Sequence, residues 1–403
     1  MTSRRKFIKQ SALAAAGTIA VPAFLKSLEA QAASKFAAAD SNKVLVVIQL
    51  SGGNDGLNTV IPIKNDIYYK ARPKIAIAAD DALEFTKDAA FHPQLKVFNE
   101  FYDQGILSVV NSVGYQNADR THSGAMEAWH TARSGKDNIH KTGWIGRYLD
   151  ENCPPCKKNY MAVQIDDTVS LALRGEIVKG IAVSDPERAY KNFGNDYFKE
   201  VASIKDSAAE GSPIHFLYQT MEDTQSSISY IYEKSKIFKT KTAYPLTQFG
   251  IDLKTVAELI ISNIETKVFY VTLPGFDTHV DQLPKHEKIL AKYADGIKAF
   301  VKDLKSNNKM NDVMIMTFSE FGRQLNENES EGSDHGVGNN VFLINGALKK
   351  PGLFNAMPNL EELEFGGLRP AVDFKNIYAT LLKKWLNADD NEILGKQYQH
   401  FNF

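Results

Sequence analysis

Several acidic and imidazole side chains that can bind a cation stand just beyond apolar runs of the 403-residue sequence. Carboxylates mixed with imidazoles suit hard-to-borderline divalent ions, so Zn, Mn, Mg and Ca all fit by ligand type. Such ions would neutralise an anionic substrate and activate a hydroxyl or a water. The sequence therefore predicts a site for one or two divalent ions, and its candidate ligands are Asp55, Asp277, His279, Glu320 and His335.

A threonine stands among these candidates. Thr121 or Ser123 suits the N-cap of a helix, where the side chain accepts a backbone N–H bond. A hydroxyl at a helix N-terminus beyond a strand is also where an anion or a transferred phosphoryl group would be stabilised. His122 could orient that hydroxyl or bind substrate. Arg120 and Arg323 could each clamp an oxyanion, although an exposed salt bridge is the alternative for both.

The elements that must position these side chains are expected to be buried strands. Continuous apolar runs are typical of parallel strands covered on both faces, and ligands bind outside the carboxyl ends of such strands. If the strands are parallel neighbours, the candidates converge on one crevice. The sequence thus predicts an α/β fold with strands at Val44–Ile48, Ile106–Val110, Lys267–Leu273, Val313–Met316 and Val341–Ile344.

The stretch from Val313 to Gly336 is expected to be a buried strand that runs into a polar loop. Glu320 and His335 are its candidate ligands, and Asp334 is a candidate for supporting them. Residues 326–331 are interpreted as a polar connector. The alternative for the whole stretch is a strand followed by a solvated acidic loop.

The composition limits the class of protein. With 43% hydrophobic and 24% charged residues, the chain suits one large soluble α/β domain or two closely packed ones. Its 47 basic residues are balanced by 48 acidic ones, and no basic stripe carries interleaved aromatic residues, so nucleic acid is not an expected partner. We expect a single domain over residues 43–403 with a helical insertion at roughly 186–250.

The N-terminal sequence predicts export. Residues 1–32 combine Arg4-Arg5 with a short apolar stretch and small residues near Ala32, the pattern of a twin-arginine signal peptide, and residues 33–42 are a spacer. The apolar stretch is too short for a membrane span. We expect the twin-arginine export machinery as a partner, a periplasmic or extracellular location and no stable transmembrane span.

The two cysteines, Cys153 and Cys156, form a CPPC motif, and a local disulfide is allowed in an exported chain. A thioredoxin-type site needs a βαβ context, which this motif lacks because it follows a helical stretch. We interpret it as a structural turn, and a redox protein is an alternative.

Four motifs together carry a resemblance. They are LSGGNDGLNTVIP (50–62), GFDTH (275–279), TFSEFGR (317–323) and SDHG (333–336), behind the twin-arginine signal. The combination resembles domain-of-unknown-function family 1501, which is similar to the alkaline phosphatase and sulfatase superfamily, over roughly residues 40–400. The resemblance implies a three-layer sandwich with a mostly parallel central sheet, and hydrolysis of an anionic phosphate or sulfate ester with the help of a metal.

Roles follow from the resemblance position by position. Asp55 resembles the carboxylate that binds one metal after the first strand. Thr121 occupies the place of the hydroxyl nucleophile. Asp277 resembles the acid of the second metal site, and His335 resembles the final histidine ligand.

The sequence also departs from the superfamily pattern. The histidine usually found four residues after the acid is here Asp281, so His279 or His286 could fill its role, and we prefer His279. An expected Asp-His pair is replaced by Ser319-Glu320. These departures keep a second hypothesis open, a non-catalytic exported binding or assembly protein that retains the fold.

Overall fold

The computed structural model describes residues 42–133, 141–152, 158–193 and 213–403. The predicted signal peptide, the spacer up to residue 41 and both cysteines lie outside these ranges. Within them, no helix combines the length and the apolar character needed to cross a membrane.

A central sheet organises the described residues, and nine strands within them take part in it. All neighbouring pairs are parallel except those of β12, which runs antiparallel to β9 and β5. The predicted mostly parallel sheet is confirmed. Its order is β13 (Gly352–Leu353), β5 (Leu107–Gly114), β12 (Asn339–Ile344), β9 (Val313–Phe318), β1 (Val44–Ser51), β8 (Val268–Pro274), β6 (Ala162–Gln164) and β7 (Ile181–Ala182), with β16 (Val372–Asp373) also paired to β5.

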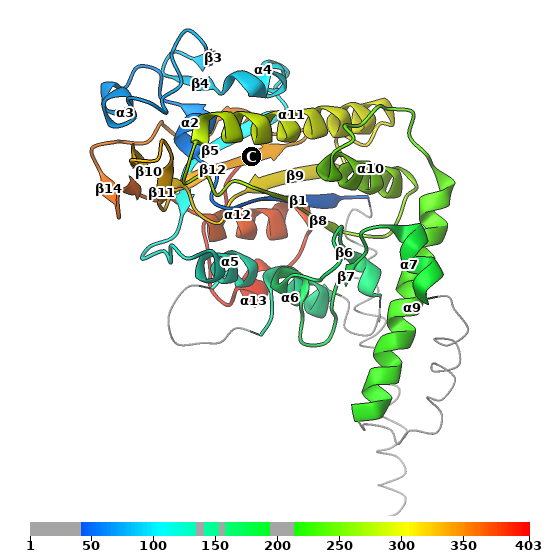
Figure 1. The fold of residues 1–403 in the computed structure, drawn as a ribbon. Coiled ribbons are helices and arrows are strands. Elements are labelled where there is room, and N and C mark those ends of the chain that lie inside the picture. Colours follow the sequence, from blue (N-terminus) through cyan, green and yellow to red (C-terminus); the bar gives the residue numbers. More distant parts are fainter. Residues whose placement is uncertain (1–41, 134–140, 153–157, 194–212) are drawn as a thin grey trace, which may run out of the picture.

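Helices cover both faces of this sheet (Figure 1). In β1, Val46 and Ile48 join one apolar core, whereas Leu45 and Val47 join the other, because successive side chains of a strand point to opposite faces. The first core lies under α4 (Lys96–Asp103), α10 (Gln248–Ile261) and α11 (Gln282–Ser306), and the second under α5 (His122–Thr131), α6 (Trp144–Asn152), α12 (Phe374–Thr380) and α13 (Asp390–Leu394). The fold is therefore the predicted three-layer α/β sandwich.

The stretch after β9 differs from the prediction. Instead of a polar loop, β10 (Arg323–Glu327) and β11 (Ser333–His335) form an antiparallel hairpin, in which Arg323 pairs with His335. The hairpin belongs to a small sheet with β15 (Gly367–Leu368) and β14 (Leu363–Glu364). The backbone pairing of this sheet fixes the position of His335, which a free loop would not do.

The remaining elements lie around this body. A second small sheet joins β2 (Val60–Ile61), β4 (Ala89–Phe91) and β3 (Leu83–Thr86), and short helices form at α2 (Gly56–Thr59) and α3 (Asp66–Ala71). Single turns occur at Pro93–Leu95, Asn159–Met161, Leu171–Leu173 and Leu381–Trp385. Helices α7 (Pro186–Phe193) and α9 (Pro213–Ile237) stand at the margin beyond β6 and β7 (Figure 1), and the limits of the predicted insertion stay a prediction.

Candidate functional site

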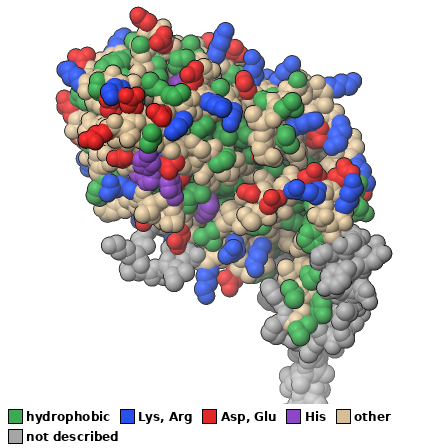
Figure 2. Space-filling model, in the orientation of Figure 1, with side chains coloured by type: hydrophobic (Ala, Val, Ile, Leu, Met, Phe, Trp, Pro, Cys, Tyr) green, Lys and Arg blue, Asp and Glu red, His purple; other side chains and the backbone are tan. Residues whose placement is uncertain are grey.

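Polar side chains from several strand ends meet at one edge of the sandwich. Thr121 and His122 begin α5, which follows β5, while Asp277 and His279 follow β8 and His335 ends β11. The space-filling view shows imidazoles gathered in one exposed patch beside acidic side chains, near the small β10–β11 sheet (Figure 2). The predicted convergence at the carboxyl ends of the strands is thus present for these residues.

Three imidazoles surround the carboxylate of Asp277. The Nε2 atoms of His279 and His335 lie 3.1 and 3.3 Å from its Oδ1, and the Nε2 of His122 lies 3.5 Å from its Oδ2. The ligand atoms of His122, Asp277 and His335 all lie within 4.8 Å of one another. Separations of this size are what the ligands of a single divalent ion require.

The opposite nitrogen of each ring is held by a neighbour. The Nδ1 of His335 lies 2.8 Å from the carbonyl oxygen of Arg120, and a carbonyl can only accept, so this nitrogen carries the proton. His279 Nδ1 lies 3.0 Å from Asp334 Oδ1, and His122 Nδ1 lies 3.1 Å from Glu320 Oε1. In a neutral ring with a protonated Nδ1, Nε2 presents a lone pair, and all three such atoms face Asp277.

The surroundings of Asp277 favour its charged carboxylate form. Burial opposes the charge of Asp277, but the hydrogen bond from Arg323 outweighs it and lowers the pKa of Asp277 to about 2. Burial also lowers the pKa of His335 below its ordinary value. The hydrogen bond from Asn328 is the main cause that lowers the pKa of Asp334. The site therefore gathers electron-pair donors around a charged carboxylate.

Arg323 holds the central carboxylate in place. Its guanidinium is fully buried and donates to Asp277 Oδ1 at 2.7 Å. It also donates to four backbone carbonyl groups, those of Gly52, Gly53, Phe276 and Ser333. All its contacts are therefore with the protein, and the structure does not bring it to the surface where the predicted oxyanion would bind.

The turn at Gly52-Gly53 lets two segments approach closely. Both residues have positive φ, 119° and 77°. A Cβ atom at Gly52 would lie 2.5 Å from the backbone nitrogen of Asp277, and one at Gly53 would lie 2.2 Å from the ring of Phe321. Glycine is required at both positions because the turn that follows β1 packs directly against the segment that carries Asp277.

Two predicted ligands, Glu320 and Asp55, are buried and do not surround Asp277 as the imidazoles do. Glu320 is 2% exposed and accepts from the backbone N–H of Gly52 at 2.8 Å as well as facing His122. Asp55 caps α2, its Oδ2 pairs with Arg72 Nη1 at 2.6 Å, and Gln282 Nε2 donates to the same oxygen. Burial opposes the charge of Asp55, but Arg72 outweighs it and lowers its pKa. The structure does not bring Asp55 to the three imidazoles.

The choice between two histidines is clear in the geometry. His279 faces Asp277, as described above, whereas His286 is buried and its Nε2 lies 2.9 Å from Asn54 Oδ1. Only His279 of the two therefore reaches the cluster.

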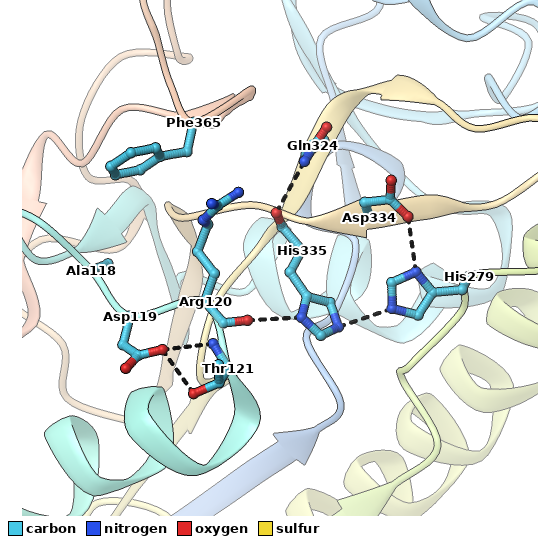
Figure 3. A pocket seen from close by; sticks show the side chains of 9 residues that line it. All are labelled: Ala118, Asp119, Arg120, Thr121, His279, Gln324, Asp334, His335 and Phe365. Atoms are coloured by element: carbon cyan, nitrogen blue, oxygen red, sulfur yellow. Dashed lines mark hydrogen bonds and ion pairs between the residues drawn. The ribbon is translucent and has the colours of Figure 1, made fainter.

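A pocket of about 560 Å³ opens beside the imidazoles (Figure 3), and Thr121 lines it. Thr121 Oγ1 accepts from the backbone N–H of Gly124 at 3.2 Å, so the predicted N-cap is present, and it donates to Asp119 Oδ1 at 2.8 Å. Sequence reasoning missed Asp119, although its place two residues before Thr121 is typical of an Asx turn. The other lining residues are Ala118, Arg120, His279, Gln324, Asp334, His335 and Phe365.

Residues 256–402 match the model of a family described as "Protein of unknown function (DUF1501)". The predicted resemblance to this family is confirmed for that part of the chain. No curated protein matches the chain.

The fold is similar to several solved structures at low identity. The lipoteichoic acid synthase LtaP from Listeria monocytogenes is 10% identical, with 78% of this chain and 68% of that chain covered and a TM-score of 0.37. The C-terminal periplasmic domain of EcEptC from Escherichia coli, in complex with Zn, is 11% identical, with coverages of 76% and 73% and a TM-score of 0.36. The PsFucS1 sulfatase from Pseudoalteromonas sp. is 13% identical, with coverages of 92% and 74% and a TM-score of 0.36.

Proposed function

We propose that this protein is an exported, metal-dependent hydrolase of a phosphate or sulfate ester. The proposal rests on one observation above all: three imidazoles turn Nε2 toward the carboxylate of Asp277 while each Nδ1 faces an acceptor elsewhere. Lone pairs converging in this way repel one another unless a cation lies between them. We assign His122, Asp277, His279 and His335 as the ligands of that cation.

This assignment changes two roles expected from the sequence. His122 becomes a ligand instead of a substrate-binding residue, since its Nε2 faces Asp277. Glu320 becomes the residue that orients His122 through Nδ1. Metal-bound histidines usually donate their second nitrogen to a carboxylate or a carbonyl, and all three rings here have such a partner. In the same proposal Arg323 positions Asp277, and Asp55 stabilises the turn after β1.

The donor set narrows the choice of ion. Three imidazole nitrogens and one carboxylate suit zinc or manganese better than calcium or magnesium, which prefer oxygen ligands. The side chains of His122, His279 and Asp277 are 42%, 38% and 46% exposed, so the site is open to solvent on one side, as a catalytic centre requires. The bound ion would supply positive charge that stabilises the developing negative charge of the reacting group.

The residues that line the pocket could carry out transfer of a phosphoryl or sulfuryl group to a nucleophile. In the proposed reaction, Thr121 Oγ1 attacks the phosphorus or sulfur atom and its proton passes to Asp119 Oδ1. The bond to the leaving oxygen breaks as the bond to Oγ1 forms, and Asp119 passes the proton on to that oxygen, so that the alcohol is released. The hydrogen bond between these two groups is already formed at 2.8 Å. Arg120 lines the same pocket and provides a guanidinium for the equatorial oxygens of the ester. Water then hydrolyses the bond to Thr121 and restores the hydroxyl group.

Elemental analysis of the purified full-length protein tests the ion, and a panel of phosphate and sulfate esters tests turnover. Thr121→Ala should abolish turnover with the ion retained. Thr247→Ala is a matched control, because Thr247 caps α10 through the same bond to a glycine N–H three residues on, yet does not line the pocket. A protein without bound ion that gains no thermal stability from added zinc or manganese contradicts the metal assignment. A loaded protein that turns over no ester favours the non-catalytic binding protein.

The proposed location depends on residues 1–32 alone. Replacing Arg4 and Arg5 by lysine should keep the folded protein inside the cell, because the twin-arginine machinery reads the arginine pair. Fractionation by osmotic shock measures the change. Unaltered export of the double variant would argue for another route.

A further inference from the structure

Phe365 is an exposed aromatic residue that lines the pocket. Its exposed fraction is 54%, whereas large apolar residues are usually buried. In Figure 3 its ring stands across from Thr121 and Asp119, at the end of the pocket toward which the side chain of Arg120 extends. The pocket therefore has a polar floor and an aromatic rim.

The backbone at Phe365 is unfavourable for its side chain. Phe365 and Gly366 connect β14 to β15, and their φ angles are 50° and 78°. A two-residue hairpin loop with two positive φ angles is the type I′ pattern, which favours Asn-Gly or Gly-Gly. A bulky residue with positive φ is uncommon and strained. Neither burial nor turn geometry accounts for phenylalanine at this position.

The ring is paired with a cation that forms no salt bridge within the described part of the chain. The guanidinium carbon of Arg120 lies 4.8 Å from the centroid of the Phe365 ring. No carboxylate of the described residues forms a salt bridge with Arg120, which leaves its charge available to an anionic ligand. A guanidinium over the face of an aromatic ring at this distance is within the range of a cation–π interaction, which restrains where it lies.

We infer that Phe365 and Arg120 form a recognition wall for esters of cyclic alcohols, phenols or sugars, in preference to esters of straight-chain alcohols. The inference depends on the proposed function for the anionic group, which binds near Arg120 and the imidazoles. The ring of the alcohol then lies against the exposed ring of Phe365. Aromatic faces bind flat rings with favourable geometry, whereas a short alkyl chain gains little contact there.

Binding of phenylphosphonate and ethylphosphonate, which cannot be hydrolysed, tests the inference without turnover. Isothermal titration with the metal-loaded protein should give about tenfold tighter binding of phenylphosphonate. Phe365→Ala should remove most of that preference and leave the affinity for ethylphosphonate within about twofold. Phe365→Tyr should keep the preference. Leu363→Ala, in the same hairpin and 37% exposed but outside the pocket, is the matched control.

Phe365→Asn separates recognition from structure. Asparagine tolerates positive φ, so this variant should melt at a higher temperature than the wild type while losing the preference for the phenyl ligand. An unchanged preference in Phe365→Ala and Phe365→Asn overturns the inference. If neither phosphonate binds the loaded wild-type protein, the proposed anion site has failed as well. A preference for the phenyl ligand in a protein that hydrolyses no ester supports the proposed recognition by Phe365 and Arg120. It contradicts only the catalytic part of the proposed function.

Discussion

The Nε2 atoms of His279 and His335 lie 2.9 Å apart, and each ring directs Nδ1 to a different acceptor. With both rings protonated on Nδ1, the Nε2 lone pairs lie at this separation and Asp277 Oδ1 lies within 3.3 Å of both, an arrangement that a cation would stabilise.

Removing one imidazole should abolish stabilisation by the ion. Zinc at a hundredfold excess over its dissociation constant should raise the free energy of unfolding of the wild type by about 2.7 kcal/mol. His335→Ala should lose most of that gain, because a central ligand is missing. Thermal denaturation with and without zinc measures both values. His400→Gln is a control, because His400 pairs with Asp390 away from the pocket, and equal zinc responses of all three proteins would contradict the ligand assignment.

Glu320→Gln distinguishes an orienting residue from a direct ligand. If Glu320 acts by fixing the ring of His122, the variant should still bind zinc, with an affinity lowered by about 10–100-fold. Competition against a chromophoric chelator measures the affinity. Complete loss of zinc would instead favour the direct ligand role expected from the sequence. Glu362→Gln, on an exposed surface pair, should leave the affinity unchanged.

Gly52→Ala should damage both stability and the ion site. The added methyl group would lie 2.5 Å from the backbone nitrogen of Asp277, at a φ of 119° that alanine disfavours. We expect a loss of about 2–4 kcal/mol in the free energy of unfolding and weaker zinc binding, since Asp277 must move. Urea denaturation and chelator competition measure the two effects.

Gly395→Ala is the control for that substitution. Gly395 also has a positive φ, 71°, but no atom lies within 4 Å of an added Cβ. This variant should lose about 1 kcal/mol through backbone strain alone and bind zinc normally. If both glycine variants lose the same stability and keep the ion, close approach at Gly52 does not hold the site.

Asp252 gives the protein a pH dependence that is separate from the ion site. Burial is the main cause that raises the pKa of Asp252 from 3.8 to about 6. Because the folded-state pKa is the higher one, the unfolded chain loses its proton first as the pH rises. Stability therefore falls between pH 3.8 and about 6 and stays lower above this range.

Asp252→Asn should remove this loss. The expected gain in the free energy of unfolding is about 1–3 kcal/mol at pH 7.5 and close to zero below pH 4. Gln248 Nε2 now donates to Asp252 Oδ1 at 2.8 Å, and an amide at position 252 can keep that bond. Urea denaturation at both pH values measures the gain, and an equal effect at pH 4 and pH 7.5 would rule out titration as its cause.

The sequence was sufficient for the sheet but not for the hairpin that carries His335. The apolar run of β1 predicts a strand buried on both faces, and Val46 and Val47 do enter opposite cores. In β10, however, a charged residue, Arg323, points inward and is 2% exposed. A buried charge breaks the alternation by which a strand is recognised, so the hairpin resembles a polar loop in the sequence.

In the site, too, the positions of strand ends could be predicted from the sequence, whereas contacts between distant segments could not. Proximity to strand ends correctly placed Asp277, His279 and His335 in one cluster. Proximity to a strand end did not predict the position of Asp55, because Arg72 and Gln282, from two other segments, bind its carboxylate. Which partner engages a strand-end acid depends on tertiary contacts that spacing does not encode. Asp119 was missed because its role depends on a hydrogen bond to Thr121.

The five hydrogen bonds of Arg323 have a consequence for the order of events during maturation. They fix Asp277 against the carbonyl groups of four other residues without any help from a cation. The metal-free chain should therefore fold to nearly its final shape, and uptake of the proposed ion would be a late step that is decoupled from folding. Such a protein would take up the proposed ion after it has left the ribosome, in whichever compartment supplies the metal.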